Sequence, residues 1–398
     1  MLEGIIVTLV ASVAYAVLSR AFTDKTRRLI AYRGRLVKDC IFHRHEFIAT
    51  VVANELDTPL GGDDFIDYGI AERNGYYPGE RRVFNLRIGG RLQAVELPYK
   101  ELVDFIGRDT AIRLDTTDFD HPFELSQELL EKTQPAFDSF RATRLLKTND
   151  ATVRVCRFGD DPSAPGRYRC ALQKATYHDQ VRTNLTLDRL FPGIEEDSIR
   201  SIDLGKDKAL RPFEESVMAN TLGVSAIWVM EDGTTPLRKK RLKYFLMPRS
   251  RRTGVYSGML SSVGGVARAP RGGVFPATLE EYAAAEMKRE FIEESGIDIL
   301  VAEGKLRDED IRIIPLAFLR DLVRGGKPQF FFLISTPHVR SRDLDKAFRK
   351  SYNGIEEFSR GSLLRMRKMK LSPETLANLL YALAWIQRRR KANFIDLG

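Results

Sequence analysis

The chain has 398 residues, enough for two or three domains, and 43% of them are hydrophobic, enough for a sizeable core. Its cysteines, Cys40, Cys156 and Cys170, are few and widely spaced, which excludes a disulfide framework or a cysteine metal cluster and fits a reducing compartment. The formal net charge of +9 is spread along the chain. Exposed solubilising charge is the commoner explanation, although anionic nucleotides or an anionic membrane leaflet would be attracted by the same charge.

The first predicted element is an uncharged apolar segment from Gly4 to Leu18. It is short for a bilayer, where about 20 residues are typical, but Ser19 and the aliphatic stem of Arg20 extend it. Positive residues follow the segment, so the positive-inside rule puts the amino end outside and the rest of the chain in the cytoplasm. We therefore expect residues 1–22 to form a single transmembrane anchor.

Two other interpretations of this segment remain open. A cleaved signal peptide would carry a positive charge before the apolar run, where this chain has Glu3, although Ala14-Tyr15-Ala16 is an acceptable cleavage site. A buried helix of a soluble protein is the second alternative. In a membrane span, small residues at every fourth position would favour self-association of the helices, as here at Gly4, Thr8, Ser12 and Ala16.

After the anchor, residues 23–62 are interpreted as a juxtamembrane helix or linker, and residues 63–214 as an α+β middle region. Alternating residues and turn signals predict strands at 82–88, 92–97, 152–156 and 168–172. The last two flank a loop rich in Gly, Pro and Asp, which predicts a hairpin. The segment 124–147 predicts a helix.

Ligand-binding candidates follow this hairpin, in the segment from Ala175 to Asp188, which concentrates aromatic, amide, hydroxyl and arginine side chains. Such groups can contact a nucleotide, so Tyr177 and Asn184 are candidate ligand-binding residues. An amphipathic connector with ordinary helix caps explains the same pattern.

The C-terminal region, 215–398, alternates β-rich apolar runs with two amphipathic helices. Strands are predicted at 224–230, 242–249, 259–265, 311–319 and 329–334, with helices at about 278–295 and 373–390. The second helix has an apolar face formed by Leu376, Leu379, Leu380, Leu383 and Ile386. The order predicts a mixed α/β sheet flanked by helices.

The helix at 278–295 is the most acidic stretch in this order. Glu290, Glu293 and Glu294 lie at i, i+3 and i+4, so their carboxylates share one face, which Glu286 joins from one turn upstream. Carboxylates this close repel one another unless a cation or protons intervene, and hard oxygen ligands suit Mg²⁺. A solvated acidic helix face is the alternative.

The rest of this helix is arranged to pack and to end. Apolar residues fall roughly opposite the glutamates and can pack on a sheet; they are Ala284, Ala285, Phe291 and Ile292. Gly296 is placed to end the helix as a left-handed cap.

The string from Arg289 to Ile297 resembles the core of the Nudix box, Arg-Glu-apolar-x-Glu-Glu-x-Gly-apolar, at every specified position. The resemblance covers about 215–398 and implies a Nudix α/β/α sandwich. It implies that Arg289 orients the glutamates and that a divalent cation, Mg²⁺ or Mn²⁺, is held on a diphosphate by Glu290, Glu293 and Glu294. The implied ligand contacts nearby are Arg249, Gly264 and Gly265, on the strand and glycine turn before the helix.

One departure from the Nudix pattern concerns the glycine that lets the backbone approach a phosphate. Glu281 fits the first glutamate of the pattern, but Phe275 holds the expected glycine position. Either Gly273 takes the role with two extra residues, or Gly265 takes it with a longer insertion. The displacement leaves open whether the chain hydrolyses its ligand.

A Nudix region behind a membrane span resembles the transmembrane–NUDIX effectors of CBASS, bacterial anti-phage systems. Their SMODS-associated NUDIX domain is encoded beside a cyclic-oligonucleotide synthase, and the segments Tyr177–Asp188 and Glu215–Val224 resemble the lead-in to such domains. The resemblance implies an effector in the bacterial inner membrane that binds a cyclic oligonucleotide or other nucleotide on its cytoplasmic side. Clustering into a homo-oligomer would then disrupt the membrane lipid, in a functional link with a nucleotidyltransferase.

Two alternatives to the effector are kept. The first is a membrane-tethered, metal-dependent Nudix hydrolase of a nucleoside diphosphate derivative. The second is a secreted Nudix enzyme, which would have a mature chain that starts near Val17.

Overall fold

The structure is a computed structural model. It describes Val52, Glu55 and the ranges 61–88, 91–108, 110–144, 146, 148–193, 197–232, 241–336, 356–357, 370–390 and 395–396. The predicted anchor, 1–22, lies outside these residues, and so does most of the predicted linker, 23–62. Among the residues described, no helix combines the length and the apolar character needed to cross a bilayer.

The centre of the molecule is an eight-stranded sheet of order β13-β8-β7-β12-β11-β3, with β10 paired to β7 and β9 to β8. Only the pairing of β7 with β12 is parallel within this sheet as described. Its strands are β3 (Tyr99–Asp104), β7 (Gly223–Asp232), β8 (Arg241–Pro248), β9 (Leu260–Ser261), β10 (Val263–Val266), β11 (Arg312–Asp321), β12 (Lys327–Ser335) and β13 (Glu356–Glu357). Strand β3 precedes residue 215 in the chain, so the sheet joins the middle and C-terminal regions.

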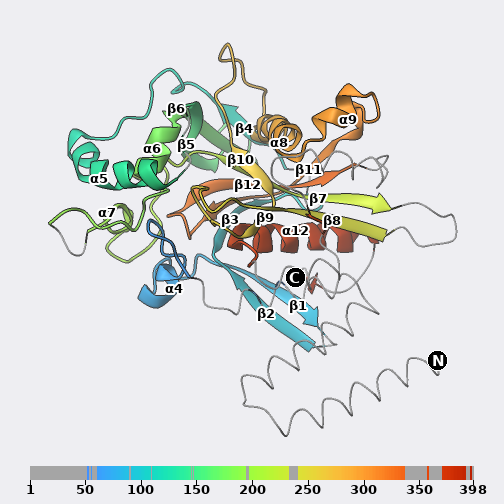
Figure 1. Cartoon of the computed structure of the whole chain (residues 1–398), viewed down its shortest axis with the longest axis horizontal. Helices are drawn as coiled ribbons and strands as arrows, with labels where there is room; N and C mark the ends of the chain where they lie inside the picture. Colours follow the sequence, from blue (N-terminus) through green and yellow to red (C-terminus); the bar gives the residue numbers. More distant parts are fainter. Residues whose placement is uncertain are drawn as a thin grey trace, which may run out of the picture.

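Two long helices cover opposite faces of this sheet, α8 (Leu279–Ser295) and α12 (Pro373–Arg390) (Figure 1). The alternation of β7 assigns the faces, because successive side chains of a strand point to opposite sides. Ile227 and Val229 pack with the residues of α12, whereas Trp228 and Met230 pack with those of α8. The mixed sheet with helices on both faces, predicted for the C-terminal region, is confirmed.

Helix α8 follows its predicted limits. Thr278 caps its start by accepting a hydrogen bond from the backbone N–H of Glu281, and Gly296 ends it in the left-handed conformation at φ 68°. Of the four residues expected to pack on the sheet, Phe291, Ile292 and Ala284 do so, and Ala285 is exposed. The buried sheet-facing positions are Leu279, Tyr282, Ala283, Met287 and Phe291.

Helix α12 also forms as predicted, but it is buried on more sides than the single apolar face that was predicted. The five predicted apolar residues are buried, and so are Ala377, Tyr381 and Ala382 on its other sides. Short helices α9 (Asp298–Ala302) and η1 (Asp308–Asp310) connect α8 to β11.

Two smaller sheets flank the centre, of order β14-β1-β2 and β4-β6-β5. Their strands are β1 (Arg82–Ile88), β2 (Arg91–Leu97), β4 (Ile112–Asp115), β5 (Ala151–Asp160), β6 (Tyr168–Thr176) and β14 (Ile395–Asp396). The predicted strands of the middle region are confirmed. The β5–β6 hairpin is longer than predicted and carries a bulge between Val155 and Arg157.

The remaining helices of the described chain belong to the middle region. They are α4 (Ile70–Asn74), α5 (Gln127–Thr143), α6 (Tyr177–Arg182) and α7 (Ile199–Asp203). Helix α5 is shorter than the predicted 124–147, because Ser126 caps its start by accepting from the N–H of Leu129. A capping box between Thr176 and Asp179 starts α6, which places Tyr177 at its first position.

Candidate functional site

The acidic face of α8 is held together by Arg289. One guanidinium nitrogen donates to Glu286 at 2.8 Å and to Glu290 at 2.6 Å, and the other donates to Glu293 at 3.0 Å. Arg268, from the segment after β10, also donates to Glu293 at 3.2 Å. The structure therefore brings Arg289, Glu290 and Glu293 into one cluster and excludes a face of independent, solvated charges.

Gly264 and Gly265 were predicted to form a turn, but they belong to strand β10 and pair with Ser225 and Val224 of β7. Glu290 lies directly against the backbone of this glycine pair. Its side chain is buried, and a Cβ atom at Gly265 would come within 2.6 Å of both carboxylate oxygens. Gly273 instead lies in an open loop, at φ 71°, with nothing within 4 Å of such an atom. Of the two glycines considered from the sequence, Gly265 is the one that packs against the box, and the chain between it and α8 is the longer insertion.

Glu294 completes the acidic cluster beside the glycine pair of β10, Gly264 and Gly265. Its carboxylate accepts a hydrogen bond from the backbone N–H of Gly264 at 3.3 Å. Burial, with the neighbouring charge of Glu290, raises the pKa of Glu294 to about 7. Burial also raises the pKa of Glu290, against the opposing effect of Arg289. Two carboxylates with raised pKa values mark a place where a proton or a cation is favoured.

The fit to a divalent cation depends on this donor set. Glu290, Glu293 and Glu294 are the residues that could hold Mg²⁺ or Mn²⁺, and partly buried carboxylate oxygens suit both ions. In the described part of the chain, however, no three acidic, histidine or cysteine side chains converge closely enough to enclose an ion. Arg289 engages Glu290 and Glu293 in this arrangement, so a bound cation would share or displace its contacts.

A cavity of about 90 Å³ adjoins β10. Four of the five predicted ligand-binding residues line it, Tyr177, Arg249, Gly264 and Gly265. That volume holds several water molecules, since a cavity needs about 10–15 Å³ of such space for one. The cavity is therefore large enough for a compact ionic group and too small to enclose a nucleotide.

The fifth predicted residue, Asn184, does not line this cavity. It is fully buried, and its amide nitrogen donates to the backbone carbonyl of Arg324 at 3.1 Å. Its side-chain oxygen accepts from the backbone N–H of Asn220 at 3.0 Å. Asn184 therefore supports the chain behind the cavity.

Charged residues that the sequence analysis missed also line the cavity. Arg324 donates to Asp321 at 2.6 Å and to Glu374 at 2.8 Å, and all three are buried. Lys327, at the start of β12, is 1% exposed. A charged residue that opens an otherwise apolar strand is the one sequence signal that could have singled out Lys327.

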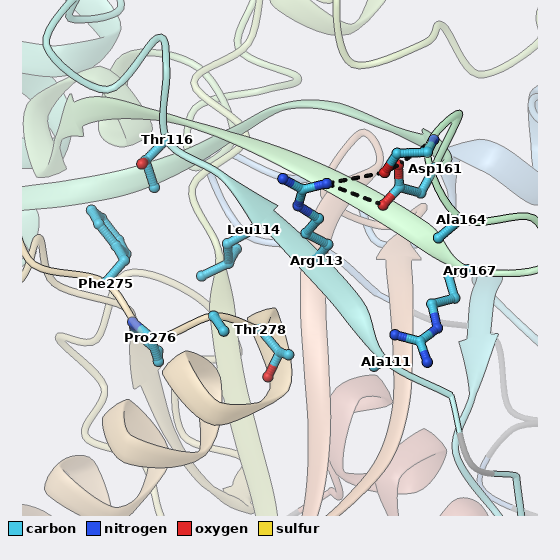
Figure 2. A pocket seen from close by; sticks show the side chains of 12 residues that line it. Ala111, Arg113, Leu114, Thr116, Asp161, Ala164, Arg167, Phe275, Pro276 and Thr278 are labelled. Atoms are coloured by element: carbon cyan, nitrogen blue, oxygen red, sulfur yellow. Dashed lines mark hydrogen bonds and ion pairs between the residues drawn. The ribbon is translucent and has the colours of Figure 1, made fainter.

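A second, larger groove of about 510 Å³ lies between β4, the loop of Asp161 and Arg167, and the inserted segment before α8 (Figure 2). Arg113 crosses one side, where it donates to Ser163 at 3.0 Å. Phe275 and Thr278 form the opposite side. None of the predicted site residues lines this groove.

No protein-family model and no curated protein matches the chain. The similar solved structures include a mutT/nudix family protein from Listeria innocua, 20% identical over 43% of this chain and 96% of its own, with a TM-score of 0.29. They also include Shewanella oneidensis NrtR, 16% identical over 43% of this chain and 64% of its own, with a TM-score of 0.28. A Nudix hydrolase from M. smegmatis, RenU, is 11% identical over 43% and 86%, with a TM-score of 0.23. TM-scores below 0.5 do not by themselves establish a common function.

Proposed function

We propose that residues 215–398 form a Nudix domain that binds a nucleotide through its diphosphate and a divalent cation. The contact between the Glu290 carboxylate and the backbone of Gly265 carries this proposal. It joins helix α8 to strand β10, and Arg289 donates hydrogen bonds to the neighbouring carboxylates of Glu286 and Glu293. A solvated helix face with unrelated charges would not place a buried carboxylate against the backbone of Gly265.

The residues of the site have distinct roles in this proposal. Glu290, Glu293 and Glu294 would hold Mg²⁺ or Mn²⁺, and the ion would neutralise phosphate charge and activate a water for in-line attack. Arg289 keeps the carboxylates oriented. The absence of a side chain at Gly265 lets the Glu290 carboxylate lie against the strand backbone.

At the level of the whole chain, the proposal is a membrane-anchored effector of a CBASS-like antiviral system. Residues 1–22 anchor it in the bacterial inner membrane, and the cytoplasmic Nudix domain senses a cyclic oligonucleotide made by a partner nucleotidyltransferase. Binding clusters the protomers, and the spans disrupt the lipid bilayer. The uncharged segment Gly4–Leu18 and its small residues at four-residue spacing support this proposal.

The second candidate is a membrane-tethered hydrolase of a nucleoside diphosphate derivative. The raised pKa values of Glu290 and Glu294 support it: burial is their main cause, and a divalent cation would stabilise the buried carboxylates in the charged form that a metal-dependent hydrolase needs.

Replacement of Glu293 and Glu294 by Gln in the full-length chain separates the two candidates. Metal-dependent turnover of nucleoside diphosphate derivatives is measured on the purified protein, and growth arrest on phage challenge is measured in cells. Arrest that survives the loss of turnover supports the effector, whereas arrest that is lost together with turnover supports the hydrolase. Glu131→Gln, on the exposed side of α5, is the matched control.

The domain assignment itself has a separate test, the binding of Mn²⁺ to the same proteins. Wild type that binds no Mn²⁺ and no nucleotide would overturn the Nudix proposal.

A further inference from the structure

The buried ammonium group of Lys327 lines the cavity beside β10, on the face of the sheet opposite α8. Lys327 and Gln329 occupy the positions of β12 that alternate with Phe330 and Phe332, which pack against α8. They therefore share the side of Phe331 and Leu333, which pack with α12. Gly264 and Gly265 lie between this cavity and the carboxylates of α8.

The side-chain ammonium of Lys327 has no hydrogen-bond or ion-pair partner in the part of the chain that the structure describes, although the residue is 1% exposed. The two nearby carboxylates, Asp321 and Glu374, are each engaged by Arg324. Burial, together with the charge of Arg324, lowers the pKa of Lys327 well below its ordinary value. A buried ammonium without a partner is costly, so an acceptor in the cavity would stabilise it.

Two further polar groups of the cavity lack partners among the residues that the structure describes. Gln180 is 2% exposed, and its side-chain oxygen accepts no hydrogen bond. The Nε–H of Arg249 donates none, although another nitrogen of that guanidinium donates to Ser261 at 3.3 Å. Two donors and one acceptor thus remain free around a volume of about 90 Å³.

We propose that this cavity is a binding site for a compact oxyanion, a phosphate ion or the phosphoryl group of a phosphorylated ligand, with Lys327 as its main contact. Phosphate oxygens accept from Lys327 and Arg249, and a protonated phosphate oxygen donates to Gln180. The volume admits one such group and excludes the base and sugar of a nucleotide. The site contains none of the box carboxylates, so binding here needs no divalent cation.

The test is calorimetric titration of the full-length chain in the presence of EDTA, first with inorganic phosphate and then with adenosine 5′-monophosphate and adenosine. Binding of phosphate and of the monophosphate, without adenosine, is expected. Binding of the monophosphate alone identifies the site as one for a phosphoryl group of a ligand. Failure of both to bind overturns the proposal and leaves a cavity that holds water.

The variant Lys327→Met keeps the length of the side chain and removes its charge. We expect a loss of affinity of roughly tenfold to a hundredfold, the range for a hydrogen bond to a charged group. Lys288→Met, on the exposed surface of α8 where Lys288 pairs with Asp308, should bind as wild type does. Unchanged affinity in Lys327→Met would overturn the assignment of Lys327.

Gly223→Ala is an independent variant that retains every charge. A Cβ atom at Gly223 would clash with the side-chain oxygen of Gln329 and come within 2.5 Å of the Lys327 ammonium, so the alanine should displace both groups of the cavity and weaken phosphate binding. This variant keeps the proposal testable if Lys327→Met fails to fold. Phosphate binding that withstands Gly223→Ala while the melting temperature shows an intact fold would count against the site. Loss of Mn²⁺ binding in the Glu293 and Glu294 variants would bear only on the Nudix proposal.

Discussion

The carboxylate of Glu290 lies against the backbone of Gly265, so that a single methyl group added to the glycine would come within 2.6 Å of both carboxylate oxygens. The two residues are 25 positions apart and belong to different elements, β10 and α8. This contact determines how closely the acidic cluster of α8 can approach strand β10.

Replacement of Gly265 by Ala should therefore displace Glu290. We expect Mn²⁺ affinity to fall by about tenfold or more, the usual scale for disturbing the support of a metal ligand. Titration of Mn²⁺ into the purified chain measures it. Gly159→Ala is the control, because nothing lies within 4 Å of a Cβ atom there. Equal affinities in the two variants would show that the close approach is unimportant for binding.

Replacement of Arg289 by Ala should destabilise the metal-free protein by about 1–3 kcal/mol, because buried Glu290 loses the cation that compensates its charge. Urea unfolding at pH 8 with EDTA measures the change. The difference from wild type should shrink as the pH is lowered from 8 to 5, because Glu290 needs no cation once it is protonated. A difference that stays constant between these pH values would contradict this explanation.

The raised pKa of Glu294 predicts a pH dependence of stability in metal-free protein. Between pH 4.5 and about 7 the folded protein holds a proton that the unfolded chain has released. The unfolded state binds fewer protons there, so the free energy of unfolding falls as the pH rises, by up to about 3 kcal/mol. Stability from this group is complete below pH 4.5 and lost above about pH 7.

Urea unfolding of wild type and Glu294→Gln across pH 4.5–8, both with EDTA, tests this dependence. The glutamine variant cannot ionise at this position, so it should gain stability relative to wild type as the pH rises. Mg²⁺ at pH 8 should narrow the gap by stabilising wild type. Parallel curves for the two proteins would mean that Glu294 titrates normally.

How much of the site the sequence could predict follows from these residues. The carboxylates of α8 were predictable because helical periodicity places Glu290, Glu293 and Glu294 on one face in any tertiary context. The choice between Gly265 and Gly273 could not be predicted, because the length of an insertion does not determine which glycine packs against the helix.

The cavity was less predictable, since its walls come from segments as distant as α6, β12 and the start of α12. An amide such as Asn184 suits both a ligand and a buried backbone group, so only the assembled fold distinguishes these roles. Strand β3 was not predicted at all, and only its pairing with β11 in the assembled sheet identifies it.

The link between the middle and C-terminal regions gives the last prediction. Arg200 of α7 is buried, donates to Asp188 at 2.6 and 3.0 Å, and donates to the backbone carbonyls of Leu322 and Val323 at 3.0 and 2.7 Å. Arg200→Leu leaves the Asp188 carboxylate buried without its partner, so we expect a loss of about 3–5 kcal/mol in the free energy of unfolding.

Urea unfolding of the purified chain measures this loss. Lys132→Met, which breaks the exposed pair with Glu128, should cost less than about 1 kcal/mol and serves as the control. Because Arg200 joins residues on both sides of the predicted boundary at 214/215, its removal should also let protease cleave the middle region before the C-terminal one. Two variants of equal stability and equal protease resistance would mean that the two regions do not depend on this contact.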